Sequence, residues 1–261
     1  MDSRHPMADI TTALCADRIA FNSFFHMKTF LSSIPEFMDS VPDYPITGII
    51  DEIRGKSTVM LPGMDFTDYE ENKESHENKI PLVIWNHRWS YDKNAASFFY
   101  AVDSMINKGM EFELALLGES QEQRIPDVFQ IAKERLGKRI IQFGYVENRK
   151  DYMNWLKRGT VVISTAKQEN FGMAMVEAMR YGCLPLLPNR LSYPEILPEQ
   201  YHDDFLYSNQ REFLQKFQCI LMGDNRFRKI SSEISKAMDS YSWPQRIEDY
   251  DREIESLCKS K

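Results

Sequence analysis

Two acidic side chains bracket a Phe-Gly turn in the stretch QENFGMAMVEAM, residues 168–179. Glu169 precedes the turn, and Glu177 lies eight positions further along the chain. If a helix begins near Met173, its side chains tilt towards its N-terminus, so both carboxylates can face one ligand. Each ionised carboxylate can accept hydrogen bonds from a diol, while the free N–H groups at the helix start, beside Gly172, bind an anion. A ligand that carries phosphate beside several hydroxyls, such as a nucleotide-sugar, fits this pattern.

A diphosphate also needs cations, and an earlier loop supplies them. The stretch WNHRWSYDK contains Arg88 and Lys93 directly after an apolar run. Arginine offers a planar fork of donors and lysine a point charge, and both are used to bind phosphate. We therefore expect Arg88 and Lys93 to contribute to the same site as the two acids.

The elements that must position these residues begin near Ile80, where short apolar runs alternate with amphipathic stretches, as in βαβ units. The predicted strands are Pro81–Asn86, Glu113–Leu117, Arg139–Tyr145, Val161–Thr165, Leu184–Leu187 and Asp204–Tyr207. The predicted helices are Asn94–Lys108, Ile125–Leu136, Lys150–Lys157, Met173–Tyr181 and Gln210–Met222. This pattern predicts an α/β fold with a doubly wound parallel sheet, which binds ligands beyond the carboxyl ends of its strands.

The flanking sequence divides the chain further. Residues 66–79 are dense in charge and poor in apolar side chains, as a linker would be, so we expect a donor-binding domain at 80–240. Residues 1–65 predict a partial α/β domain, with strands at Arg18–Asn22 and Thr58–Leu61 around a helix at His26–Asp39. Residues 241–261 predict a closing helix, since Pro244 suits a first helical turn.

Composition excludes several classes of protein. At 261 residues and 43% hydrophobic content, the chain can fold around a sizeable core. Its four cysteines lie far apart without a CxxC pair, so the sequence suggests neither a zinc site nor a disulfide framework. The net charge of −7 gives no general reason to expect nucleic-acid binding. Apolar runs are too short for a membrane span and no signal peptide is evident, so we expect a cytoplasmic protein that does not bind membranes.

The motifs occur in an order that resembles a known group of enzymes. A basic strand-end loop is followed by Gly144-Tyr145-Val146 and then by two glutamates eight positions apart around a Phe-Gly. This order resembles the donor half of retaining GT-B glycosyltransferases of the glycogen-synthase-like group. The strings IWNHRWSYDK, LLGES, FGYVENRKDY, VVISTAK, FGMAMVEAM, LSYPEILP and CADRIAFNSFFH are similar to the tRNA-queuosine α-mannosyltransferases. The likeness covers the C-terminal two thirds of that family, although its usual His-Glu-Phe-Phe-Gly loop reads Gln-Glu-Asn-Phe-Gly here.

The resemblance implies a GT-B fold, with a complete C-terminal Rossmann-like donor domain and a partial N-terminal α/β domain. It implies transfer of mannose from GDP-mannose to queuosine in tRNA-Asp, without a metal or other cofactor. Arg88 and Lys93 would hold the donor diphosphate. Glu177 would bind the nucleotide ribose, and Glu169 would contact the transferred sugar.

The same resemblance assigns the rest of the donor site. Phe171, Gly172 and Met173 would present backbone amides to the donor. Tyr145 and Val146 would border the nucleobase. The partners implied are a nucleotide-sugar and, through the complete enzyme, a tRNA acceptor.

Two histidines are further candidates with structural alternatives. His26, in FNSFFH, can face a substrate cleft or serve as a packed histidine among phenylalanines. His87, beside Arg88, can reach a phosphate or brace its loop by hydrogen bonding. Trp85, Trp89 and Tyr91 suggest base stacking on RNA, but aromatics at a strand end more often serve core and loop packing.

Three functions remain open from the sequence. The first is the mannosyl transfer just described. The second is a retaining transferase with another nucleotide-sugar or a small acceptor, favoured by the altered Gln168–Asn170 loop and the acidic net charge. The third is a donor-binding module without activity of its own, because GT-B catalysis needs two domains around the substrates.

Overall fold

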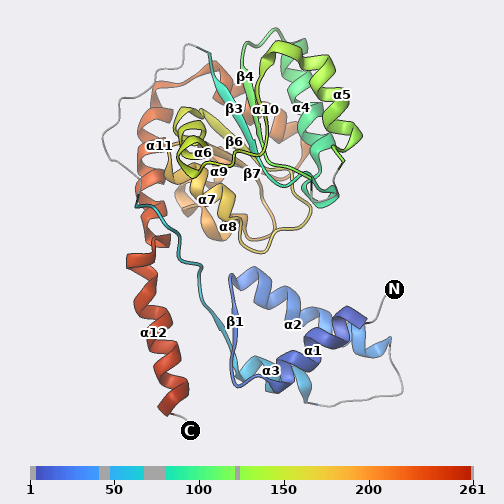
Figure 1. Ribbon diagram of the computed structural model, residues 1–261, viewed down its shortest axis with the longest axis vertical. Helices are drawn as coiled ribbons and strands as arrows, with labels where there is room; N and C mark the ends of the chain where they lie inside the picture. The colour runs from blue at the N-terminus through green and yellow to red at the C-terminus, as the bar shows by residue number, and fades with distance from the viewer. Residues whose placement is uncertain (1–3, 41–47, 68–79, 121–123, 260–261) are drawn as a thin grey trace. The chain divides into compact units, whose positions relative to one another are not determined.

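The computed structural model describes residues 4–40, 48–67, 80–120 and 124–259. The chain divides into two compact units. Figure 1 colours the ribbon by residue number, so the segments of each unit can be followed. Unit 1 contains Met1–Met64 and Tyr241–Lys261, and unit 2 contains Asp65–Ser240. The linker predicted at 66–79 lies outside the described residues from position 68 onward.

Unit 2 is built on a parallel sheet, whose described strands run in the order β5-β4-β3-β6-β7-β8. The strands are β3 (Leu82–Asn86), β4 (Glu113–Leu117), β5 (Ile140–Gly144), β6 (Val161–Ile163), β7 (Leu184–Pro188) and β8 (Leu206–Tyr207). Each predicted strand has a counterpart here, but the strand predicted at Asp204–Tyr207 is reduced to Leu206–Tyr207, because Asp204 and Phe205 belong to the helix α9 (His202–Phe205). The sequence signal was the apolar run: all five residues of β3 are buried, as expected for a strand covered on both faces.

Helices cover both faces of the sheet. Those predicted from sequence are α4 (Ala95–Asn107), α5 (Asp127–Leu136), α6 (Arg149–Arg158), α7 (Met173–Arg180) and α10 (Gln210–Met222). The structure adds α8 (Tyr193–Ile196), α9 (His202–Phe205), α11 (Asn225–Ala237) and the 3₁₀ turns η1 (Tyr91–Lys93), η2 (Gly137–Arg139), η3 (Glu199–Tyr201) and η4 (Met238–Tyr241). In Figure 1, α4 and α5 lie on one side of the sheet, and α6, α7 and α11 lie on the other.

The strand order places two loops side by side. Successive strands β3, β4 and β5 run outward in one direction, whereas β6, β7 and β8 run outward in the other. The order reverses between β3 and β6, which pair through Val83↔Val161 and Ile84↔Val162. A crevice forms beyond the carboxyl ends of the strands at such a reversal. The loops that carry Lys93 and Glu169 follow these two strands.

Unit 1 contains a short parallel pair, β1 (Ile19–Phe21) with β2 (Ser57–Val59), and the helices α1 (Arg4–Cys15), α2 (Phe24–Asp39), α3 (Ile49–Gly55) and α12 (Trp243–Lys259). Both strands, α2 and α12 match the sequence expectations, whereas α1 and α3 were missed. The core of the unit includes Ile10 from α1, Ile34 from α2 and Ile53 from α3.

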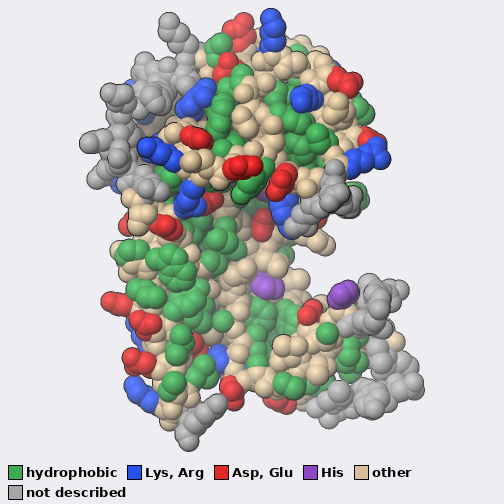
Figure 2. All heavy atoms as spheres, in the orientation of Figure 1, with side chains coloured by type: hydrophobic (Ala, Val, Ile, Leu, Met, Phe, Trp, Pro, Cys, Tyr) green, Lys and Arg blue, Asp and Glu red, His purple; other side chains and the backbone are tan. Residues whose placement is uncertain are grey.

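The helix α12 joins unit 1 through contacts along its length. The guanidinium of Arg18 lies 2.7 Å from the carboxylate of Glu253, and the Tyr250 hydroxyl donates to the Leu61 carbonyl at 3.3 Å. Hydrophobic side chains gather along α12 on the face shown in Figure 2. Ile254, a residue of this helix, is 58% exposed. No helix in the described ranges is both long and apolar enough to cross a membrane.

Gly118 closes the loop after β4 against the loop after β3. A Cβ atom added at Gly118 would collide with the backbone carbonyl of His87, which cannot swing away as a side chain can. We expect Gly118→Ala to lower the free energy of unfolding by about 3 kcal/mol, because the backbone must shift to relieve the overlap. Urea unfolding followed by tryptophan fluorescence measures the loss.

Gly109→Ala is the matched control for this substitution. Both glycines have a positive φ, +156° at Gly118 and +75° at Gly109, but at Gly109 open space surrounds the added Cβ. Its cost should therefore be the backbone strain alone, about 1 kcal/mol. Equal losses in the two variants would contradict the close approach at Gly118.

Candidate functional site

The loop after β3 presents one cation outward and one inward. Its backbone is tied to the loop after β4, since the Trp89 N–H donates to the Glu119 carbonyl at 2.8 Å. Arg88 is exposed at the strand end, and the described residues offer it no ion pair. Lys93, five positions later, is only 7% exposed. The two predicted phosphate ligands thus lie in different environments on one loop.

The loop after β6 supplies the partners of Lys93. The Lys93 Nζ lies 3.3 Å from the carboxylate of Glu169 and 3.1 Å from that of Asp92, and it donates to the Gln168 carbonyl at 2.9 Å. The Thr165 hydroxyl donates to the Lys93 carbonyl at 2.9 Å, which joins the two backbones as well. The structure therefore brings Lys93 and Glu169 together, as the parallel sheet predicted.

Gly172 lets the second half of this loop turn into α7. Its φ is +98°, a region that side chains disfavour, and an added Cβ would lie 3.3 Å from side-chain atoms of both Tyr193 and Ile196. Phe171 is buried before the turn, and Met173, the first residue of α7, is 50% exposed. Because the first N–H groups of a helix have no intrahelical acceptor, this turn presents donors at the carboxyl end of the sheet.

Glu177 is held by two side chains of α6. Its Oε2 accepts a hydrogen bond from the Tyr152 hydroxyl at 3.1 Å, and its Oε1 lies 3.5 Å from the Arg149 guanidinium. Burial raises the pKa of Glu177, whereas Tyr152 and Arg149 act in the opposite direction. The Asn86 amide donates to the Tyr152 oxygen at 2.6 Å.

Sequence reasoning missed Asn86, Tyr152 and Arg149. A usable signal existed: Asn86 ends a predicted strand, and Arg149 lies at the start of the helix that follows another. Both are therefore at the edge of the sheet where ligands bind. Their pairing with Glu177 depends on how α6 packs against α7, which the sequence does not specify.

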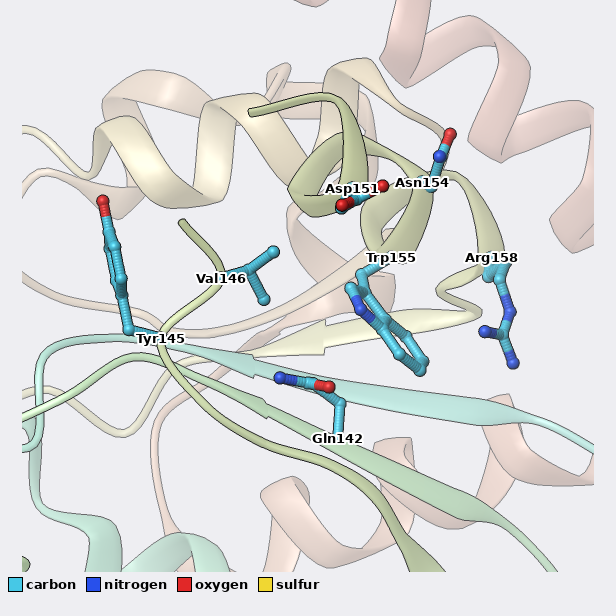
Figure 3. A pocket seen from close by; sticks show the side chains of 7 residues that line it. All are labelled: Gln142, Tyr145, Val146, Asp151, Asn154, Trp155 and Arg158. Carbon is cyan, nitrogen blue, oxygen red and sulfur yellow. The ribbon is translucent and has the colours of Figure 1, made fainter. Parts of the chain in front are cut away.

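Tyr145 and Val146 border a pocket of about 390 Å³ between β5 and α6. Its lining also includes Gln142, Asp151, Asn154, Trp155 and Arg158. In Figure 3 the Trp155 ring points from α6 towards Gln142, while Tyr145 points away from Trp155. The pocket thus offers an aromatic surface beside amide and carboxylate groups, a lining suited to a planar heterocycle.

The two candidate histidines are packed against other side chains of the protein. His87 is buried, with its ring 5.2 Å from that of Trp85, and within the described part of the chain its Nε2 has no hydrogen-bond partner. His26 belongs to unit 1, where its Nδ1 lies 2.9 Å from the Asn22 side-chain oxygen and its ring meets Phe21 edge-on. Burial lowers the pKa of both imidazoles.

Comparison with known families agrees with this architecture. Residues 67–236, more than half of the chain, match the family described as glycosyl transferases group 1. The chain belongs to the group 1 glycosyltransferases. Its residues 1–64 match the family described as tRNA-queuosine alpha-mannosyltransferase N-terminal. The resemblance inferred from the sequence motifs is therefore confirmed in both parts of this glycosyltransferase chain.

Individual relatives support the same assignment. A tRNA-queuosine alpha-mannosyltransferase from Drosophila melanogaster is 33% identical over 236 residues, which cover 87% of this chain and 61% of the fly protein. The chain thus spans about three fifths of that relative.

Two solved structures share the fold, each at 14% identity. Sucrose-phosphate synthase from Thermosynechococcus elongatus matches with a TM-score of 0.76, covering 100% of this chain and 63% of that chain. Anabaena Alr3699/HepE, solved in complex with UDP and glucose, matches with a TM-score of 0.73, covering 100% of this chain and 68% of that chain. The predicted GT-B glycosyltransferase fold is confirmed.

Burial of His87 makes stability depend on pH. Burial, with the charge of Lys93 nearby, lowers the pKa of His87 from 6.5 to about 3 in the folded protein. Between these two pH values His87 is more protonated in the unfolded chain than in the folded protein. Its contribution to the free energy of unfolding therefore rises with pH. We expect His87→Asn to flatten this rise between about pH 4.5 and 6.5, by up to about 1.4 kcal/mol per pH unit. Urea titrations of both proteins across this range test it, and identical slopes would contradict a neutral buried His87.

Proposed function

We propose that this glycosyltransferase transfers mannose from GDP-mannose to queuosine in tRNA-Asp, with retention of configuration. The observation that carries the proposal is the 33% identity with the fly tRNA-queuosine alpha-mannosyltransferase, over 87% of this chain. The match of residues 1–64 to the N-terminal family of those enzymes supports it independently of the donor half. Donor, acceptor and activity are all parts of this proposal, because the chain spans 61% of that relative.

The geometry of unit 2 supports a nucleotide-sugar site at the reversal of the strand order. In the proposal, Glu177 accepts hydrogen bonds from the ribose hydroxyls, and Glu169 contacts the transferred mannose. Glu169 already lies 3.3 Å from Lys93, so an acid for the sugar and a cation for the diphosphate are adjacent. The base would occupy the pocket that Tyr145 and Val146 border.

The proposed chemistry is electrostatic. As the bond from mannose to GDP breaks, negative charge develops on the leaving diphosphate. Arg88, Lys93 and the backbone N–H groups of Phe171, Gly172 and Met173 would stabilise that charge, which lowers the barrier. Cationic side chains take the place that a divalent ion holds in other transferases, so metal-independent transfer is part of the proposal.

A second candidate is a transferase with another nucleotide-sugar. The loop Gln168–Asn170 departs from the usual His-Glu-Phe in the resembling family. A protein of the same fold was solved with UDP and glucose, so this architecture accommodates a uridine nucleotide. Base and sugar preference therefore decide between the two candidates.

Donor binding tests the site directly. We expect the protein to bind GDP-mannose more tightly than UDP-glucose in isothermal titration calorimetry. Glu177→Gln and Arg88→Ala should each weaken GDP-mannose binding by about tenfold to a hundredfold, because each removes a charged hydrogen-bond partner of the ligand.

Two substitutions on α5 serve as matched controls. Glu134→Gln and Arg135→Ala remove an acid and an arginine from an exposed helix outside the site. Their affinities should equal that of the unmodified protein. Preference for UDP-glucose would favour the second candidate, and full affinity in both site variants would contradict the proposed site.

Transfer to RNA tests the acceptor. Radiolabelled GDP-mannose is incubated with tRNA-Asp that carries queuosine, and with the same tRNA that carries guanosine at that position. Label is expected only in the queuosine tRNA, and only with enzyme whose Glu169 and Lys93 are intact. GDP-mannose binding without transfer would identify this chain as a donor-binding portion of the enzyme, the third function left open by the sequence.

A further inference from the structure

Tyr152 lies beside Glu177, the acid proposed for the ribose, and has so far been given no part in donor binding. It extends from α6, and its hydroxyl donates to Glu177 Oε2 at 3.1 Å. The Tyr152 hydroxyl oxygen in turn accepts a hydrogen bond from the Asn86 Nδ2 at 2.6 Å. Asn86 in turn donates to the Ala174 carbonyl at 3.3 Å, in the first turn of α7. A chain of hydrogen bonds therefore runs from the end of β3 through Tyr152 to Glu177.

Arg149 engages the other oxygen of the same carboxylate. Its Nη1 lies 3.5 Å from Glu177 Oε1, and its Nη2 donates to the Asp65 carbonyl at 2.6 Å. Arg149 and Tyr152 are three positions apart on α6, a spacing that places side chains on one helix face. Each Glu177 oxygen thus has one partner from α6.

This arrangement leaves acceptor capacity for a ligand. An ionised carboxylate offers about four acceptor positions on two oxygens. Tyr152 and Arg149 occupy one position on each oxygen, so one on each oxygen remains. Two vicinal hydroxyls, such as those of a ribose, would need one acceptor from each.

We propose that Tyr152 is a positioning residue, which holds the Glu177 carboxylate ionised and oriented for the two ribose hydroxyls of the donor nucleotide. The inference rests on the ribose role of Glu177 in the proposed function and adds the residue that makes this role specific. Asn86 fixes the Tyr152 hydroxyl, because an amide N–H directed at the phenol oxygen leaves the phenol proton for Glu177. A phenylalanine would fill the same space without donating that proton.

The decisive experiment compares ligands that differ only in the ribose. GDP and 2′,3′-dideoxy-GDP share the base and diphosphate, and only GDP offers the two hydroxyls. We expect Tyr152→Phe to weaken GDP binding by about fivefold to twentyfold and to change dideoxy-GDP binding by less than about twofold. A merely structural role of Tyr152 would weaken both ligands equally, and that outcome would overturn the inference.

Two further variants isolate the pathway through Glu177. Glu177→Gln should remove most of the preference for GDP over dideoxy-GDP, and adding Tyr152→Phe to it should cost little more, because the two side chains act as one unit. Tyr181→Phe removes the hydroxyl of another buried tyrosine, which donates to the Met153 sulfur, and should leave both affinities unchanged. Additive losses in the double variant would contradict the inference.

A pH profile gives an independent readout. Among the residues that the structure describes, the charged or titratable groups that face Glu177 are Tyr152 and Arg149, both on α6, and both lower its pKa against the effect of burial. Removing the Tyr152 hydroxyl lets that pKa rise, so Glu177 becomes protonated at a higher pH and loses its acceptor there. As the pH is lowered, Tyr152→Phe should therefore lose GDP-mannose binding at a higher pH than the unmodified protein does. Coincident profiles would count against the inference.

The outcomes separate the two proposals. If the unmodified protein binds GDP and dideoxy-GDP equally, the ribose role of Glu177 fails, and the positioning role falls with it. If the unmodified protein prefers GDP and Tyr152→Phe retains that preference in full, only the positioning role fails. Circular dichroism and thermal unfolding of each variant establish that a loss of affinity is not a loss of fold.

Discussion

Pairing of β3 with β6 is the constraint on which the site depends. These strands are separated by 74 residues between Asn86 and Val161, yet they pair in parallel at the reversal of the strand order. Parallel pairing aligns the carboxyl ends of both strands, so the loops that follow them meet without any special contact to draw them together. Thr165 then joins them by donating to the Lys93 carbonyl. Lys93 and Glu169 are neighbours because of the sheet, and their ion pair is a consequence rather than a cause.

Burial of charge explains why this site contains both signs. Lys93 is 7% exposed, and an unpaired cation at that depth would cost several kcal/mol in lost hydration. Two carboxylates and a backbone carbonyl surround its Nζ, which offsets this cost. Glu177 is stabilised in the same way by Arg149 and Tyr152. The acids suit sugar hydroxyls, and the groups that partner them offset the cost of burying their charge.

The sequence predicted the sheet well, because buried parallel strands are continuous apolar runs between amphipathic helices. It also placed Lys93 and Glu169 in loops that follow strands, where topology alone brings loops together, and Gly172 and Glu177 at the start of the next helix. It missed α11, although Phe227, Ile230 and Ile234 recur at helical spacing within its otherwise mostly polar sequence NRFRKISSEISKA. The short helices α3, α8 and α9 give too few turns for a periodic pattern.

The residues around Glu177 show where sequence reasoning ends. Tyr152 has ordinary helical neighbours, and nothing local distinguishes it from a core tyrosine. Its role depends on the angle at which α6 meets α7 and on an amide from β3, three elements far apart in sequence. Helix packing angles vary by tens of degrees among tolerated geometries, so such contacts follow from the whole fold.

The charges also constrain how a donor can enter. Lys93 is shared between Asp92 and Glu169, so this cluster of one cation and two acids has no positive charge to spare. A diphosphate adds further negative charge, which the cluster would repel unless another cation compensates. Arg88 is exposed on the same loop and has no ion pair among the described residues. The α7 N-terminus adds the positive end of a helix dipole. In the proposed donor site, electrostatics therefore favours Arg88 and the α7 amides over the Lys93 cluster as the first partners of the diphosphate.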